Sequence, residues 1–303
     1  MSAIKMRIYS IQRRILHWVG SFLALAGILF VGFRLYSYSL ELDLLQIALV
    51  DWVFIAALSI TYGAANFFLA SAWWYLMKNY RIPVSRLEST RIYGISQLAK
   101  YVPGNIFHLA GRQALGMAAG LAPGALAKST AWELGLIAIA GAQFGWLTLP
   151  LIMPQFTESI SLFLLLCSVA LTGSVLQGIF GRKAVFAFLW QILFLLVSGV
   201  IFIALILMMS GGEELTGWHW LTIGGGDIVA WLVGLVTPGA PAGVGIRELI
   251  LLFMLNGMVA EKDLLMAVLL GRLVTVGGDF LFFVVANTIP AKLGGVEKNN
   301  VSG

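Results

Sequence analysis

The sequence carries little charge. Only 11% of its 303 residues are Asp, Glu, Lys or Arg, and 60% are hydrophobic, whereas a soluble domain normally carries about 25% charged residues. Several apolar runs reach the roughly 20 residues that a helix needs to cross the ~30 Å hydrocarbon layer of a bilayer. This composition excludes a soluble protein and leaves no room for a sizeable soluble domain. We therefore expect residues 1–303 to form a single integral membrane domain.

Cysteine and histidine are also scarce. The single cysteine, Cys167, excludes an internal disulfide and a cysteine-based metal site, and we expect this small apolar side chain to be buried. The three histidines do not have the spacing of a metal site, and the sequence contains no catalytic triad, P-loop or dinucleotide fingerprint. We expect no metal, no cofactor and no enzymatic activity. Because the basic residues lie beside apolar segments, we also expect no nucleic-acid partner.

The apolar runs predict an all-α polytopic membrane protein with about six full transmembrane helices. Two further apolar segments, about 92–120 and 222–259, are interrupted in the middle by Pro-Gly. Proline and glycine both disfavour the interior of a helix, so each of these segments is expected to be a broken helix. The six predicted spans are residues 15–33, 51–77, 128–150, 159–179, 184–209 and 264–289.

Lysine and arginine are concentrated in alternate connections, which the positive-inside rule places in the cytoplasm. They lie in residues 1–14, in 78–91, at Arg182 and Lys183, and in 292–298. We therefore predict a multi-pass protein of the cell (inner) membrane with both termini in the cytoplasm. The later basic connections fall on the cytoplasmic side only if each broken segment leaves the membrane on the side where it entered. Both are thus expected to be re-entrant, the first from the cytoplasm and the second from outside.

The two broken segments resemble each other. One reads YVPGNIFHLAGR and ends at Arg112, and the other reads VTPGAPAGVGIR and ends at Arg247. The arginines are 135 positions apart, and so are the Pro-Gly pairs. Together with the opposite orientations, this spacing predicts an inverted repeat, as in transporters whose broken helices meet near the midplane. The predicted repeat units are roughly residues 51–150 and 184–289.

The breaks predict a site for an anion within the membrane. The start of a half-helix presents free N–H groups and a partial positive charge, and a guanidinium can hold two phosphate oxygens. Arg112 lies about two turns into its half-helix, and Arg247 lies in the first turn of its own. We expect these two arginines to bind an anionic head group as a matched pair.

Four further ionisable residues lie in apolar surroundings, where charges are usually paired or functional. They are candidates either for coupling ions to transport or for structural ion pairs. Arg272 and Asp279 are seven residues apart and so share a helix face. An ion pair between them, and another between Arg247 and its neighbour Glu248, is the structural alternative. The four residues are Glu133, Asp227, Arg272 and Asp279.

The segments QLAKYVPGN and PAGVGIRE resemble the two signatures of the lysylphosphatidylglycerol synthase/flippase transmembrane family. Members of that family typically read K-Y-(I/V)-P-G and P-G-G-x-G-x-R-E. The resemblance covers most of the chain from about residue 50 to 290, and Ala242 departs from the usual glycine. The matching positions are Lys100, Tyr101, Pro103, Gly104, Pro241, Gly243, Gly245, Arg247 and Glu248.

The resemblance implies lipid translocation. The family's best-understood members move aminoacylated phosphatidylglycerol between leaflets and carry a separate soluble synthase domain, which we do not expect here. Stand-alone relatives are linked with surface polysaccharide or polyprenyl-phosphate sugars. Beside the two arginines, the expected substrate-binding residues are Lys100, Tyr101, Gly104, Asn105, Gly243, Gly245 and Glu248.

We therefore expect a flippase for an anionic-head-group lipid, either an aminoacyl-phospholipid or a polyprenyl-phosphate-linked sugar. One alternative is a proton-coupled transporter of a small soluble anion, which predicts a pocket closed off from lipid. Another is a non-transporting partner that holds a cell-envelope glycosyltransferase or synthase in the membrane. That partner reading predicts that Arg112→Ala and Arg247→Ala would be nearly silent.

Overall fold

The computed structural model describes residues 48–102, 106–210, 219–237 and 246–291, and these residues form helices and short connections without a named strand. Six of the helical segments are long and apolar enough to cross a membrane, so the predicted all-α polytopic architecture is confirmed. In chain order the elements are α2 (Leu49–Asn79), α3 (Arg86–Gln97), η1 (Leu98–Tyr101), α4 (Phe107–Ala118), α5 (Pro123–Gln143), η2 (Phe144–Thr148), α6 (Leu149–Ile152), α7 (Glu158–Phe180), α8 (Arg182–Met209), α9 (His219–Val236), α10 (Ile246–Met254) and α11 (Glu261–Thr288).

Some predictions fall on residues outside the described ranges. The predicted span 15–33 and both termini are among them, as are the two Pro-Gly breaks. The same holds for four predicted site residues, namely Gly104, Asn105, Gly243 and Gly245.

Five predicted spans correspond to helices of the structure, and two differences stand out. The span predicted at 128–150 begins at Pro123, because proline fits the first turn of a helix, where its missing N–H is not needed. This span continues through η2 and α6 to Ile152. The sixth segment of membrane-crossing length is α9, which the sequence pattern assigns to one arm of a broken segment.

Local chemistry fixes several helix ends. The side chain of Ser85 accepts a hydrogen bond from the backbone N–H of Glu88 and so caps the start of α3. Thr157 caps α7 in the same way, through the N–H of Ile160. Between α7 and α8, Gly181 has a φ of 80°, which a residue with a side chain rarely adopts. This turn reverses the chain, so that α7 and α8 pack side by side.

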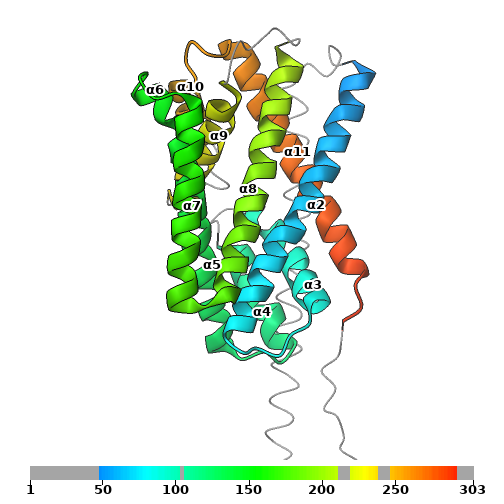
Figure 1. The fold of residues 1–303 in the computed structure, drawn as a ribbon. Helices are drawn as coiled ribbons and strands as arrows, with labels where there is room; N and C mark the ends of the chain where they lie inside the picture. The colour runs from blue at the N-terminus through cyan, green and yellow to red at the C-terminus, as the bar shows by residue number, and fades with distance from the viewer. Residues whose placement is uncertain (1–47, 103–105, 211–218, 238–245, 292–303) are drawn as a thin grey trace, which may run out of the picture.

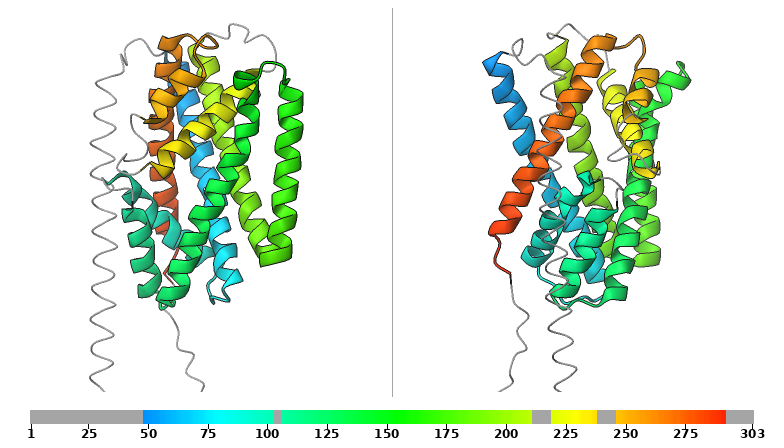
Figure 2. Two further views of the ribbon diagram at one scale, coloured as in Figure 1. Left: turned by 90° about the vertical axis from the view of Figure 1, so that its left-hand side faces the viewer. Right: turned by 180° about the vertical axis from the view of Figure 1, so that it is seen from behind.

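The helix pairs on either side of the two Pro-Gly segments lie at opposite ends of the bundle. Helices α3 and α4 pack against each other in the lower half of Figure 1, whereas α9 and α10 pack against each other in the upper half (Figures 1 and 2). Helices α2, α8 and α11 run along the bundle between the two ends. The two helix pairs thus lie toward opposite ends, as predicted, while the Pro-Gly breaks that would make each segment re-entrant lie outside the described residues.

The contacts between helices follow the predicted repeat. A shift of 135 positions places α2 on α8, α3 on α9, α4 on α10 and α5 on α11. Equivalent pairs also make equivalent contacts: α2 packs against α3 and α11, just as α8 packs against α9 and α5. Helix α2 packs extensively against α8, its own counterpart. A two-fold axis relating the units would therefore pass between α2 and α8.

Small residues allow the closest of these contacts. An added Cβ at Gly278 of α11 would lie 2.6 Å from the backbone oxygen of Ser59 and 2.8 Å from the backbone nitrogen of Gly63, both on α2. An added Cβ at Gly94 of α3 would lie 2.3 Å from the side chain of Ala286 on α11. Such close backbone approach is a common means of holding membrane helices together, because lipid tails weaken the hydrophobic drive for association.

Cys167 lies on the exposed side of α7, so the expectation that it is buried is wrong. The same helix exposes several large apolar side chains, among them Phe163, Leu166 and Leu171. An apolar run in a membrane protein can face either the protein interior or the lipid tails, and composition does not separate the two. Helix α7 is thus a lipid-facing edge of the bundle.

The α2–α11 contact predicts a difference between two glycine substitutions. Gly278→Ala should lower the free energy of unfolding by about 1–3 kcal/mol, because the added methyl group forces the two backbones apart. Gly135→Ala is the matched control on α5, since its added Cβ would meet nothing within 4 Å. Thermal unfolding in detergent, followed by circular dichroism, measures both. Equal melting temperatures for the two variants would contradict the importance of this contact.

Candidate functional site

Four ion pairs lie in the described part of the chain, and each includes a residue from a short helix within one of the two broken segments. A charge at the centre of a membrane helix costs roughly 2.5–3.5 kcal/mol on insertion scales, so pairing is expected. The pairs also tie the short helices to their neighbours. They are Lys100–Asp279, Arg112–Glu133, Arg247–Asp227 and Glu248–Arg272.

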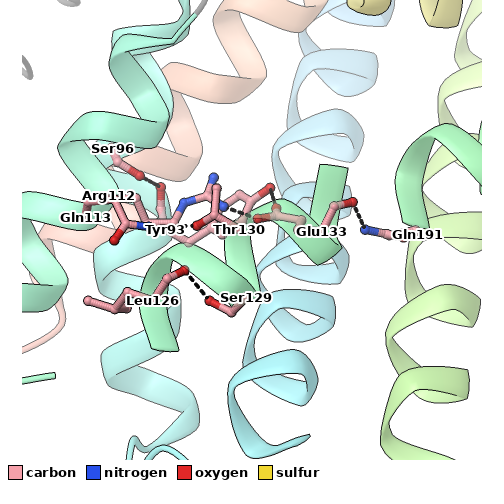
Figure 3. A network of polar contacts seen from close by, with 9 residues as sticks. All are labelled: Tyr93, Ser96, Arg112, Gln113, Leu126, Ser129, Thr130, Glu133 and Gln191. Atoms are coloured by element: carbon pink, nitrogen blue, oxygen red, sulfur yellow. Dashed lines mark hydrogen bonds and ion pairs between the residues drawn. The ribbon is translucent and has the colours of Figure 1, made fainter. Parts of the chain in front are cut away.

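The pair between Arg112 on α4 and Glu133 on α5 is completely enclosed (Figure 3). The guanidinium carbon of Arg112 lies 3.8 Å from the ring centroid of Tyr93 and 5.3 Å from that of Trp73. The Tyr93 hydroxyl donates to Glu133 Oε1 at 2.8 Å, and Gln191 donates to the Glu133 backbone oxygen at 3.1 Å. With only 1% of its side chain exposed, Arg112 is held in the protein interior.

Both short helices α4 and α10 are tied to the long helix that follows them. Gln113 Nε2 donates to Thr130 Oγ1 at 3.0 Å, which links α4 to α5. At the equivalent position of the second unit, Glu248 accepts from Nε and Nη2 of Arg272, which links α10 to α11. Both repeat units therefore link the short helix to the long helix that follows it, but through different residues.

The pair between Lys100 and Asp279 joins η1 to α11 at 2.6 Å. Asp279 is fully buried, and its two oxygens also accept from the Tyr101 hydroxyl and from Asn66 Nδ2. Gln97 in turn donates to Asn66 Oδ1 at 3.4 Å. Neutral donors thus satisfy the hydrogen bonding of both Asp279 oxygens, while Lys100 balances the charge. The Lys100 side chain is 21% exposed.

The pair between Arg247 and Asp227 joins α10 to α9. Arg247 Nη2 lies 2.6 Å from Asp227 Oδ1, and the exposed fraction of the side chain is 14% for the arginine and 1% for the aspartate. This pair is incompletely satisfied, because both Asp227 Oδ2 and Arg247 Nε are buried without a hydrogen-bond partner. An unpaired polar atom away from water is unfavourable by about 1–3 kcal/mol.

Tyr62 on α2 connects the charges of the two repeat units. Its phenol is close enough to interact electrostatically with Asp279, and with both Arg247 and Asp227. Asp279, which pairs with Lys100, and the Arg247–Asp227 pair are thus both within electrostatic range of one buried side chain on α2. An anion in this region would be within the field of cations from both units.

The structure pairs the charges differently from the structural alternative suggested by the sequence. Arg272 pairs with Glu248 rather than with Asp279, because residues seven apart on one helix share a face but lie about 10 Å apart along its axis. Arg247 pairs with Asp227 rather than with Glu248, because adjacent residues of a helix point in different directions.

Four further residues were predicted to bind the substrate, and the structure gives them different surroundings. Arg112 and Arg247, predicted as a matched pair, have different surroundings, since only Arg247 keeps some exposure. Tyr101 and Glu248 are engaged with Asp279 and Arg272.

Several residues of the polar network were not predicted. Asn66 is a lone amide in an apolar span, and this was a signal in the sequence. Tyr93 and Trp73 gave no signal, because aromatic residues are common in membrane helices and only packing brings these two to Arg112. Glu158 of α7 was also missed; it accepts from the backbone N–H and the hydroxyl of Thr222 on α9.

Comparison of the chain with protein-family models, with curated proteins and with solved structures finds no match in any of the three. Among the described residues, no group of three or more His, Cys, Asp or Glu is placed to hold a metal ion. The function is therefore argued from the polar network and the helix arrangement.

The enclosed Arg112–Glu133 pair predicts strong coupling in a double-mutant cycle. Arg112→Met or Glu133→Gln alone should lower the free energy of unfolding by about 3–5 kcal/mol, since each leaves an unmatched buried group. The double variant should lose much less than the sum of the two. Thermal or denaturant unfolding in detergent measures the cycle, and additive losses would show that the pair is not coupled.

Proposed function

We propose that the protein is a flippase that moves a lipid with an anionic head group between the membrane leaflets. The observation that carries the proposal is the incomplete enclosure of two cations, Lys100 and Arg247, near the centre of an inverted repeat. They belong to broken segments from opposite ends of the bundle. A lipid is the favoured substrate because the two motifs resemble those of a lipid-translocating family.

The head group would bind where Lys100 and Arg247 are accessible. Arg247 is in the first turn of α10, where the helix N-terminus adds partial positive charge. Arg112, by contrast, would anchor α4 through Glu133 and the aromatic rings around it. The lipid tails would stay in the bilayer, beside the exposed apolar side chains of the outer helices.

An inverted repeat suits transport, because each unit is an approximate copy of the other in the opposite orientation. Rocking one unit against the other would expose the central site to each side in turn. The α2–α8 contact, which joins the two units, is the natural pivot. The lipid gradient, the membrane potential or protons would supply the driving force, and Asp227 and Asp279 are candidate proton carriers.

The distribution of basic residues favours one orientation. The α2–α3 connection and the α7–α8 turn, with their lysines and arginines, lie at the lower end of Figure 1. The α6–α7 connection, which lacks basic residues, lies at the upper end. We therefore place the lower end of the bundle on the cytoplasmic side of the inner membrane.

This orientation predicts the labelling of two introduced cysteines. In a Cys167→Ser background, Gln155→Cys should react with a membrane-impermeant maleimide on intact spheroplasts, because residue 155 is exposed in the α6–α7 connection. Pro83→Cys, exposed in the α2–α3 connection, should react only after the membrane is permeabilised. The reverse pattern would invert the assignment.

The flippase proposal predicts a lipid bound to the purified protein. Native mass spectrometry should find one anionic lipid enriched over its share of the membrane, and Arg247→Gln should reduce that enrichment about tenfold or more through the lost charge-assisted contact. Arg182→Gln is the matched control, since it removes an equal charge at an exposed position. Bulk lipid in all three samples would contradict a head-group site and favour a partner-holding role, and a bound soluble anion would favour anion transport.

A further inference from the structure

Two buried atoms of the Arg247–Asp227 pair lack a hydrogen-bond partner, and one is a donor while the other is an acceptor. Arg247 Nε is a donor without an acceptor, and Asp227 Oδ2 is an acceptor without a donor. The two groups do not satisfy each other, because the contact between the side chains runs through Arg247 Nη2 and Asp227 Oδ1. Buried polar atoms in native structures are almost always partnered, so each vacancy needs an explanation.

Neither of the other two ion-paired arginines of the described residues offers the same combination. Arg272 directs both Nε and Nη2 to Glu248, so that edge of its guanidinium is occupied. Arg112 also has an unpartnered Nε, but it lies against two aromatic rings with 1% of its side chain exposed. Arg247 has both an unpartnered Nε and an exposed fraction of 14%.

The carboxylates show the same contrast. Glu133 receives Tyr93 on one oxygen and Arg112 on the other. Asp279 receives Asn66 on one oxygen, and Tyr101 with Lys100 on the other. Asp227 is as deeply buried as these two, but its Oδ2 receives nothing. Asp227 therefore differs from Glu133 and Asp279, each of which has a partner on both carboxylate oxygens.

We propose that Arg247 and Asp227 together recognise a phosphate that carries a hydroxyl group nearby in the same head group. Arg247 Nε donates to a phosphate oxygen, and Asp227 Oδ2 accepts from the hydroxyl. This inference rests on the proposed flippase function and narrows its substrate to phospholipids with a hydroxylated head group, such as a polyol or a sugar. A phosphate without a neighbouring hydroxyl accepts a hydrogen bond from Arg247 Nε but leaves the buried Asp227 Oδ2 without a donor.

The discrimination follows from the cost of that unpaired oxygen. A site built to accept a hydroxyl rejects an otherwise equal ligand that lacks it, because the buried acceptor is then desolvated without a partner. Two lipids with the same charge and the same tails, one with a hydroxylated head group and one without, should therefore bind with affinities that differ about tenfold. The effect of the phosphate charge cancels in this comparison.

The experiment is a competition followed by native mass spectrometry. The full-length protein in detergent receives equimolar dioleoylphosphatidylglycerol and dioleoylphosphatidylmethanol, which share one phosphodiester charge and differ in the hydroxyls. The wild type is expected to hold the glycerol lipid about tenfold more often. Asp227→Asn should bring the ratio close to one, because the amide replaces the acceptor oxygen with a donor. Arg247→Lys keeps the charge without Nε and should weaken the binding of both lipids.

The outcomes separate this inference from the flippase proposal. Equal binding of the two lipids by the wild type overturns the hydroxyl subsite and leaves a head-group site in place. An unchanged preference in Asp227→Asn overturns the assignment to this residue. Binding of neither lipid overturns both proposals. Arg182→Gln, an exposed control, should show the wild-type ratio, and the monodisperse elution of each variant shows that it is folded.

Discussion

The pairing of charges inside an apolar bundle is the constraint on which the rest of this structure depends. A membrane protein cannot leave an arginine or aspartate alone at the level of the lipid tails without a large loss of stability. The four described pairs meet this requirement and join short helices to their neighbours. The same contacts therefore neutralise the charges and hold the short helices of the two Pro-Gly segments in place.

The two repeat units share their helices but not their charges. The 135-residue shift superposes the helix order, yet it places Glu133 on Val268 and Asp227 on Ile92. The first unit pairs its arginine with the helix that follows, and the second pairs its arginine with the helix that precedes. The scaffold is thus symmetric whereas its polar residues are not: Arg112 of the first unit is enclosed, and Arg247 of the second keeps partial exposure.

The helices around this network lie in two kinds of environment. Glycines let α2 and α11 approach so closely that the backbones touch, which places Asp279 beside Asn66 and near Tyr62. Helix α7 lies at the edge and exposes apolar side chains that suit lipid tails. A lipid substrate needs both environments at once, a polar centre for the head group and an open apolar flank for the chains.

The sequence by itself determined the membrane class and most of the spans, because the hydropathy of a span depends only on a run of neighbouring residues. It also marked the buried charges as paired or functional. Only the tertiary structure decided the partners. Arg272 meets Glu248, and Arg112 lies against Tyr93 and Trp73, through contacts between different helices. Side-chain direction and helix packing set such contacts, and neither is written in the spacing of residues along one helix.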